Sequence, residues 1–220
     1  MAKIKLLVFD WDGTLVDSIE RIVAAMHYAE QKTNIAAQDD QSIRNIIGLS
    51  LNKAFAVLYP QHADDLDLRG RFLQFYSDFY IHLESTPSAF YPQVPELLEV
   101  LRTQGYFLAV ATGKSRKGLD RILQGHGMSD FFDITRCADE TQSKPNPQML
   151  EEILQHFQLA PNQAVMIGDS AYDLQMATNA KMASIAVSYG AQSLSQLTQE
   201  QPVACINHFS ELLTWLEQHN

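Results

Sequence analysis

The 220-residue sequence predicts an α/β fold, in which a doubly wound parallel sheet carries an inserted α-helical segment. Three patterns lead to this prediction. Short, continuously apolar runs are typical of parallel strands that are covered on both faces. Helical patterns alternate with these runs from about residue 91 onward, as in a doubly wound sheet. Residues 17–90 show no convincing strand, so we expect them to form a helical interruption after the first strand.

Five apolar runs are strand candidates, and each is followed by polar residues or glycine. Residues 6–9, with the sequence LLVF, are the first candidate. The others are residues 107–111, 164–167, 185–187 and, as a weaker candidate, 203–206.

Two helices of the sheet-forming part have clear sequence signals. Residues 95–104 carry spaced leucines, and Gly105 follows where a C-terminal cap is expected. Asn146 and Pro147 are typical of an N-cap and a first helical position, and apolar residues with helical spacing begin at Leu150. Together these strands and helices predict a Rossmann-like core.

The helical interruption predicts two domains: residues 1–16 and 91–220 as an α/β catalytic core, and residues 17–90 as a helical cap. Its position directly after the first strand favours a lid over the site, and the alternative is an ordinary helical bundle without a lid role. Two apolar stripes with helical spacing support the helical assignment of residues 17–90. The first consists of Ile19, Ile22, Val23 and Met26. The second consists of Phe72, Phe75, Tyr76 and Phe79, which we expect in the cap core.

Composition limits the possible partners. Hydrophobic residues make up 46% of the chain and charged residues 19%, which indicates a folded globular protein rather than a disordered one. The net charge of −10 argues against nucleic-acid binding, which needs a basic surface. Small anionic substrates remain compatible, because a local site can be positive on an acidic protein.

The sequence predicts a cytoplasmic protein without a membrane segment. No apolar run approaches the ~20 residues of a membrane span, and Asp10 ends the N-terminal apolar run too early for a signal peptide. Cys137 and Cys205 lie far apart without a CxxC partner, so we expect two buried thiols rather than a disulfide or zinc site. A monomer and a homodimer are both compatible with the sequence.

Polar residues that follow the strands are the candidate site. In an open parallel sheet, ligands bind beyond the carboxyl ends of the strands. Aspartate, threonine and lysine therefore converge on one edge of this sheet. The residues concerned are Asp10, Asp12, Gly13 and Thr14, then Thr112, Gly113 and Lys114, then Lys144, and finally Gly168, Asp169, Ser170 and Asp173.

Such an acidic cluster predicts a divalent cation. Two unit charges ~4 Å apart repel by about 4 kcal/mol at an effective dielectric constant of 20, so clustered aspartates need a cation or a proton. Hard oxygen ligands select Mg²⁺ rather than zinc, and Mg²⁺ commonly completes its coordination with water and phosphate oxygens. The pattern therefore points to phosphate chemistry on a small phosphorylated metabolite.

The residue types then suggest roles. The Asp10 carboxylate can attack phosphorus and form an aspartyl phosphate. Asp12, two residues further along an extended strand end, lies on the same side and can act as general acid and base. Thr112 can donate hydrogen bonds to a phosphate oxygen, Lys144 can neutralise negative charge, and Asp169 with Asp173 can hold the metal.

Four segments resemble the motifs of the haloacid dehalogenase-like superfamily. The string DWDGTLVDS at residues 10–18 is similar to the first motif. VATGK at residues 110–114, SKPNP at 143–147 and GDSAYD at 168–173 resemble the second, third and fourth motifs, in the same order. The resemblance covers essentially the whole chain.

This resemblance implies an Mg²⁺-dependent phosphatase with an aspartyl-phosphate intermediate and a helical cap. The implied metal ligands are Asp10, Asp169 and Asp12, the last through its backbone carbonyl, and Asp173 is either a further ligand or a support for the ligands. Thr112, Gly113 and Lys144 are the expected phosphate contacts. Gly113 stands where asparagine is often found in the family, so its contact would come from the backbone N–H.

The cap string IIGLSL at residues 46–51 resembles the phosphoglycolate-phosphatase branch, so 2-phosphoglycolate is the first candidate substrate. A phosphosugar mutase similar to β-phosphoglucomutase, a pyrophosphatase and a nucleotidase are alternatives within the family. A non-catalytic phosphoaspartate switch is the alternative outside enzymes.

Several further residues carry expectations about their environment. Trp11 is expected to point away from the two aspartates beside it, and Gln93 stands where the family commonly has glycine. The basic residues Lys114, Arg116, Lys117 and Arg121 are expected to form a solvated helix face, or alternatively a positive field for an anionic substrate. Arg44, Asn45, Lys53 and His82 are the cap residues considered for substrate selection.

Overall fold

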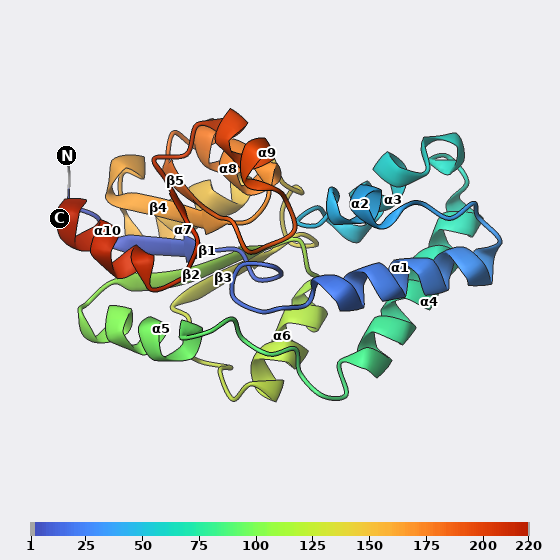
Figure 1. Ribbon diagram of the computed structural model, residues 1–220, viewed down its shortest axis with the longest axis horizontal. Coiled ribbons are helices and arrows are strands. Elements are labelled where there is room, and N and C mark those ends of the chain that lie inside the picture. Colours follow the sequence, from blue (N-terminus) through green and yellow to red (C-terminus); the bar gives the residue numbers. More distant parts are fainter. Residues whose placement is uncertain (1–2, 220) are drawn as a thin grey trace.

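The computed structural model describes residues 3–219 and contains a six-stranded parallel sheet with helices on both faces (Figure 1). The strand order is β3-β2-β1-β4-β5-β6, which is the doubly wound order. The strands are β1 (Leu6–Phe9), β2 (Phe107–Thr112), β3 (Ile134–Cys137), β4 (Ala164–Gly168), β5 (Ala183–Val187) and β6 (Ala204–Ile206). The predicted α/β fold class is confirmed.

Alternate residues of the central strand face two different helical layers. Leu6 and Val8 of β1 pack with residues of α7 (Gln148–Phe157) and α8 (Ala171–Asn179). Leu7 and Phe9 face the opposite layer, which contains α5 (Val94–Thr103), α6 (Arg116–Gly125) and α10 (Glu211–His219). A short helix, α9 (Leu194–Leu197), packs beside α8 and β5. Because both faces of the sheet are covered, the central strands β1, β2 and β4 are almost continuously apolar.

Strand β3 is absent from the five predicted strands, and α7 begins one residue later than predicted. Strand β3 has the sequence ITRC and pairs only with β2 at the sheet edge, so its residues are mostly half-buried and lack a continuous apolar run. Helix α7 starts at Gln148 with Pro147 in the N-cap position, whereas Asn146 accepts the backbone N–H of Gln148 from just outside the helix. The other five strands lie where the apolar runs place them, within one or two residues.

The interruption between β1 and β2 is helical, as predicted. It contains α1 (Ile19–Thr33), α2 (Asp40–Arg44), α3 (Leu51–Leu58) and α4 (Leu66–Leu83), together with a 3₁₀ turn at Pro60–His62. Helices α1 and α4 lie side by side and extend away from the end of the sheet (Figure 1).

The chain enters and leaves this helical segment through two paired connections. The backbone N–H of Asp17 donates to Ala89 O at 2.9 Å, and that of Tyr91 donates to Leu15 O at 3.0 Å. Val16 and Phe90 form an antiparallel bridge between them. The helical segment is therefore joined to the sheet-bearing part at one narrow, hydrogen-bonded neck.

The fold decides the expectations about Trp11, Gln93 and the two cysteines. Trp11 is fully buried against Phe90 and Phe132, away from the carboxylates, as predicted. Gln93 adopts a left-handed backbone with φ of +66°, which explains why glycine suits this position. Of the two thiols, Cys137 is buried, whereas Cys205 is only half-buried and corrects the expectation of two buried cysteines.

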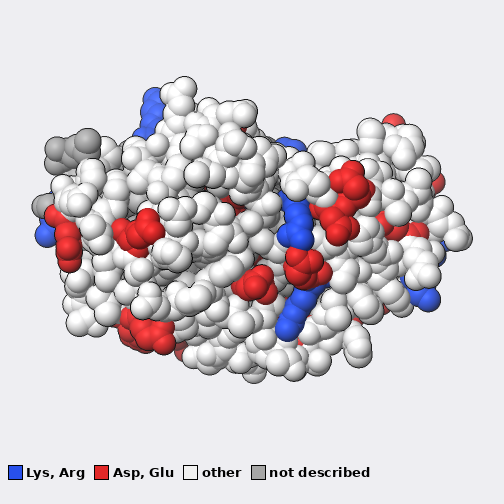
Figure 2. Space-filling view, in the orientation of Figure 1, with Lys and Arg blue, Asp and Glu red and all other residues white. Residues whose placement is uncertain are grey.

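Within residues 3–219, no helix has both the length and the apolar character needed to cross a membrane. On the face shown in Figure 2, basic side chains are few and scattered, and those near the centre of the view lie beside acidic ones. The described part of that face therefore carries no broad positive surface.

Candidate active site

The predicted site residues meet where the central strands end. Asp10 follows β1, Thr112 ends β2 and Asp169 follows β4, so parallel pairing of β1 with β2 and β4 places them at one sheet edge. This edge includes the point at which the strand order changes direction, between β1 and β4. Lys144 comes from the loop before α7, and Asp173 from the first turn of α8.

Lys144 joins two of the carboxylates in a buried ion-pair cluster. Its Nζ lies 2.6 Å from Asp10 Oδ1 and 2.6 Å from Asp173 Oδ1, and all three side chains are at most 1% exposed. Burial alone would lower the pKa of Lys144, but the two carboxylates outweigh burial and raise it. The lysine therefore stays charged and holds Asp10 from one side.

Asp10 keeps one carboxylate oxygen unpaired. Its Oδ2 is buried and has no hydrogen-bond partner among the described residues. Burial raises the pKa of Asp10 well above its ordinary value, and repulsion from Asp173 and Asp169 adds to this effect, although Lys144 opposes it. A buried carboxylate oxygen without a partner is costly, so this atom is available to a reactant or a cation.

Asp169 completes an acidic triangle. Its Oδ1 accepts a hydrogen bond from Thr14 Oγ1 at 3.1 Å, and its Oδ2 accepts one from the backbone N–H of Ala191 at 2.7 Å. Burial, together with the nearby Asp173, raises the pKa of Asp169 to about 7. Carboxylate oxygens of Asp10, Asp169 and Asp173 all lie within 4.8 Å of one another.

These residues fit a hard divalent cation. The donor set consists of carboxylate oxygens, one of them unpaired, and contains no sulfur or imidazole. Asp173 accepts three hydrogen bonds, one from the Lys144 ammonium and two from Ser170. Asp169 accepts one neutral donor on each oxygen, and Asp10 keeps Oδ2 unpaired. Asp10 and Asp169 are thus better suited to bind the ion directly.

Gly13 allows the backbone beside Asp12 to approach Asp169. It has φ of +78°, and a Cβ atom there would lie 2.1 Å from Asp169 Oδ2. Only glycine fits this conformation without displacing the carboxylate. The close approach brings the Asp12–Gly13 backbone to the acidic triangle, where the backbone carbonyl of Asp12 is expected to serve as a ligand.

The Asp12 side chain points elsewhere. Its Oδ1 accepts from the Ser18 hydroxyl at 2.5 Å, and its Oδ2 pairs with Lys114 Nζ at 3.0 Å. Lys114 also donates to Tyr80 Oη at 3.1 Å and lies 4.6 Å from the centre of that ring. Ser18 and Lys114 therefore orient Asp12, and Lys114 links it to Tyr80 of helix α4.

A cavity of about 550 Å³ opens between the sheet edge and the helical segment. Asp10 and Asp12 line it, together with Gly113 and residues of α1, α3, α4 and α6. Thr112, Lys144, Asp169 and Asp173 lie fully buried beside it and do not line it. The Thr112 hydroxyl accepts from the backbone N–H of Lys114 at 3.2 Å, so its own proton is free to be donated.

Gly113 lies directly against the helical segment. A Cβ atom at this position would come within 2.6 Å of the backbone carbonyl oxygens of both Gly48 and Leu49. The contact explains why this chain has glycine where asparagine is expected, since a larger residue would push the 48–49 loop away. Nearby, the backbone N–H of Ser50 donates to Ser143 Oγ at 2.9 Å, which also connects this loop to the core.

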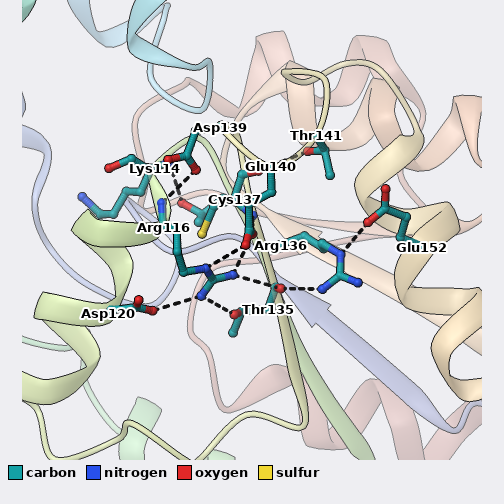
Figure 3. A network of polar contacts seen from close by, with 12 residues as sticks. Lys114, Arg116, Asp120, Thr135, Arg136, Cys137, Asp139, Glu140, Thr141 and Glu152 are labelled. Carbon is teal, nitrogen blue, oxygen red and sulfur yellow. Dashed lines mark hydrogen bonds and ion pairs between the residues drawn. The ribbon is translucent and has the colours of Figure 1, made fainter.

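The basic cluster of the sequence divides into two groups. Lys114, Lys117 and Arg121 line the cavity, whereas Arg116 turns away and pairs with Glu140, Asp120 and Thr135, as Figure 3 shows. The expectation of a solvated helix face is confirmed for Lys117, which is exposed, whereas Lys114, Arg116 and Arg121 are half-buried.

The expectations about the cap residues also need correction. Among the described residues, none of the four considered for substrate selection lines the cavity. Arg44 pairs with Glu20, and Asn45 forms hydrogen bonds with Gln41 and Gln196. Lys53 donates to Lys144 O at 3.5 Å, and His82 lies against Phe79. Tyr76, expected in the cap core, lines the cavity, whereas Phe72 is fully buried in the core as predicted.

Sequence reasoning gave no role to several residues that support the site. Thr14 and Ser18 belong to the DWDGTLVDS string, and their hydroxyls donate to Asp169 and Asp12. Their place in that string was a usable signal. By contrast, Tyr80 and the N–H of Ala191 are distant in sequence, and no local pattern indicates them.

Comparisons with known proteins agree on one family. The family model described as haloacid dehalogenase-like hydrolase matches residues 7–187. A curated relative from Dickeya dadantii, named "Probable phosphatase IndB", is 34% identical over 210 residues, which cover 94% of this chain and 91% of the relative. A phosphoglycolate phosphatase of Vibrio vulnificus is 30% identical over 220 residues, with 96% and 95% coverage.

Solved structures show the same architecture. A haloacid dehalogenase-like family hydrolase of Streptococcus pneumoniae superposes with a TM-score of 0.82 at 27% sequence identity, over 98% of this chain and 99% of that one.

Proposed function

Because the chain belongs to the haloacid dehalogenase-like hydrolase family and is a phosphatase, we propose that it hydrolyses a small phosphomonoester with Mg²⁺ through an aspartyl phosphate (an acyl phosphate) on Asp10. The observation that carries this proposal is the unpaired, buried Oδ2 of Asp10, beside an acidic triangle suited to a divalent cation. When bound, Mg²⁺ would be held by Asp10, Asp169 and the backbone carbonyl of Asp12, and it would offset negative charge on the phosphoryl oxygens.

The first step assigns separate tasks to Asp10 and Asp12. Asp10 Oδ2 attacks phosphorus, and the bond between phosphorus and the leaving alcohol oxygen breaks. Asp12 donates a proton to that oxygen, so the product leaves as a neutral alcohol. Lys144 holds the other oxygen of Asp10 and reduces the repulsion between the carboxylate and the incoming dianion.

The second step reverses the task of Asp12. Asp12 accepts a proton from water, the water oxygen bonds to phosphorus, and the bond between phosphorus and Asp10 Oδ2 breaks, which releases phosphate and restores the Asp10 carboxylate. Thr112 and the backbone N–H of Gly113 are proposed to hold phosphoryl oxygens in both steps. Asp173, which accepts from the Lys144 ammonium and twice from Ser170, is proposed to position Lys144 rather than bind the metal.

We also propose that residues 17–90 act as a cap on a core of residues 1–16 and 91–220. The narrow neck at residues 15–17 and 89–91 and the cavity between the two parts support this division. Because relatives are named phosphoglycolate phosphatases, 2-phosphoglycolate is the first substrate to test.

The test is phosphate release by the Asp10→Asn variant, with Asp67→Asn as a matched control on the exposed side of α4. We expect the Asp10 variant to lose turnover and the control to retain it, and we expect EDTA to abolish activity until Mg²⁺ is restored. Turnover by the Asp10 variant would overturn the nucleophile assignment. Sugar-phosphate isomerisation without phosphate release would instead indicate a mutase, and a single slow dephosphorylation would indicate a switch.

A further inference from the structure

The cavity beside Asp10 and Asp12 is larger than a two-carbon leaving group requires. Its volume of about 550 Å³ corresponds to roughly eighteen waters at ~30 Å³ each. This size is in the range of pockets that hold drug-sized ligands, about 300–1,000 Å³. A phosphoryl group with glycolate would fill only part of this space.

The walls supplied by the helical segment are largely apolar and aromatic. Tyr76 and Tyr80 of α4 stack with ring centres 5.8 Å apart and planes inclined by 15°. Ile22 and Met26 of α1 and Leu73 of α4 line the same cavity. Such walls favour an apolar or aromatic body over a fully hydrated one.

The opposite wall, formed by α6, is cationic. Lys117 and Arg121 lie four residues apart on one face of α6, Lys114 lies just before the helix, and all three line the cavity. Lys114 is already paired with Asp12. Lys117 and Arg121 have no ion-pair partner within residues 3–219, so their charge is available to a ligand.

Arg121 is the most informative of these residues. Its Nε is buried and has no hydrogen-bond partner among the described residues. A buried donor without an acceptor carries a desolvation cost that a bound anion would remove. The carboxylates on the cavity rim are engaged elsewhere: Asp139 accepts the backbone N–H of Arg116 at 2.8 Å, and Asp78 accepts the Gln74 amide at 2.8 Å.

Position along the helix adds a length requirement. Arg121 lies five residues beyond Arg116, the first residue of α6, which is about 7.5 Å along the axis at ~1.5 Å per residue. Lys114, before the helix, already contacts Asp12. A leaving group that starts at Asp12 and reaches Arg121 must therefore be longer than glycolate.

We infer that the preferred substrate is a phosphomonoester whose leaving group has an apolar or aromatic body, seated against α1 and α4, and an anionic end bound by Arg121 and Lys117. This inference rests on the proposed phosphomonoester hydrolysis and specifies the leaving group. Arg121 is the specificity-determining residue, and 2-phosphoglycolate has the anionic end without the body.

Four probes separate the body from the anionic end: ethyl phosphate, 2-phosphoglycolate, benzyl phosphate and 4-carboxybenzyl phosphate. All four release primary alcohols, so differences in kcat/KM report binding of the leaving group. We expect 4-carboxybenzyl phosphate to have the highest kcat/KM. Its advantage over benzyl phosphate should be about tenfold to a hundredfold, as expected for hydrogen bonds between charged groups.

The variant Arg121→Gln should remove most of that advantage, whereas Arg71→Gln, a matched change on the exposed side of α4, should preserve it. Equal kcat/KM values for the two benzyl esters, an unchanged ratio in the Arg121 variant, or a preference for 2-phosphoglycolate would each overturn the inference while leaving phosphomonoester hydrolysis intact. Failure to hydrolyse any of the four probes with Mg²⁺ would refute the proposed function, and the inference with it.

Discussion

The substitution Lys144→Met gives the sharpest test of the buried charge cluster. Methionine has a similar length and no charge, so the change removes the ammonium group with little change in volume. It leaves Asp10 and Asp173 buried without the cation that lies 2.6 Å from each. Asp173 keeps its two bonds from Ser170, whereas Asp10 loses its only side-chain partner among the described residues.

The expected loss of stability is large. Removing one partner of a buried ion pair costs about 3–5 kcal/mol, compared with a total unfolding free energy of about 5–15 kcal/mol. For a chain of this length, 1 kcal/mol corresponds to about 2–4 °C in Tm, so Tm should fall by roughly 6–20 °C.

The loss should also depend on pH. Burial raises the pKa of Asp10, so protonation of its carboxyl stabilises the folded state at low pH, and this stability is lost as the pH rises through the raised pKa. Without Lys144 the effect becomes stronger. We therefore expect the difference between variant and wild type to be greater at pH 8 than at pH 5.

Urea unfolding in EDTA, followed by the fluorescence of the buried Trp11, measures this difference. The double variant Lys144→Met/Asp173→Asn is the internal control, because it removes one of the two uncompensated carboxylates and should recover at least ~1 kcal/mol relative to the single variant. A Lys144→Met protein within ~1 kcal/mol of wild type at pH 8, or a double variant less stable than the single one, would refute the reasoning.

Three further substitutions test other parts of the structure. Gly113→Ala should displace the 48–49 loop and lower kcat/KM about tenfold or more in steady-state kinetics, and a kcat/KM equal to that of the wild type would contradict the contact. Gly70→Ala is the control, because an added Cβ meets nothing there, and urea unfolding should show α4 stabilised by about 0.5–1 kcal/mol. The hydrogen bond to Asp40 raises the pKa of His27, so the stabilising contribution of the protonated imidazole is present at low pH and is lost as the pH rises through the raised pKa. His27→Gln should flatten this part of a Tm–pH profile, and an unchanged profile would contradict the contribution of His27. Gln93→Gly should remove the steric strain of the left-handed backbone and raise the free energy of unfolding by up to about 1 kcal/mol, measured by thermal or urea unfolding. A loss of stability would show that contacts of the Gln93 side chain compensate for this strain.

Much of the candidate site can be located from local sequence patterns. Apolar runs identify the strands, and parallel strands bring their carboxyl ends to one edge, so the sequence alone predicts that Asp10 and Asp169 are neighbours. The exception, β3, shows the limit of this approach. An edge strand contacts one neighbour only, so its sequence need not be continuously apolar.

Tertiary packing decides how each side chain is used. Lys144 meets Asp10 across 134 positions of sequence and Asp173 across 29, and these contacts leave Oδ2 as the unpaired oxygen of Asp10. The packing of α6 likewise turns Arg121 toward the cavity and Arg116 toward Glu140, although both belong to one basic run.

The division between the two kinds of information has a physical cause. A strand or helix follows from short-range backbone preferences and from the periodicity of burial, which are encoded within a few residues of each position. The partner of a charged side chain depends on which distant element desolvates it and offers a counter-charge. That choice is made only when the helical segment and the sheet edge come together around the cavity.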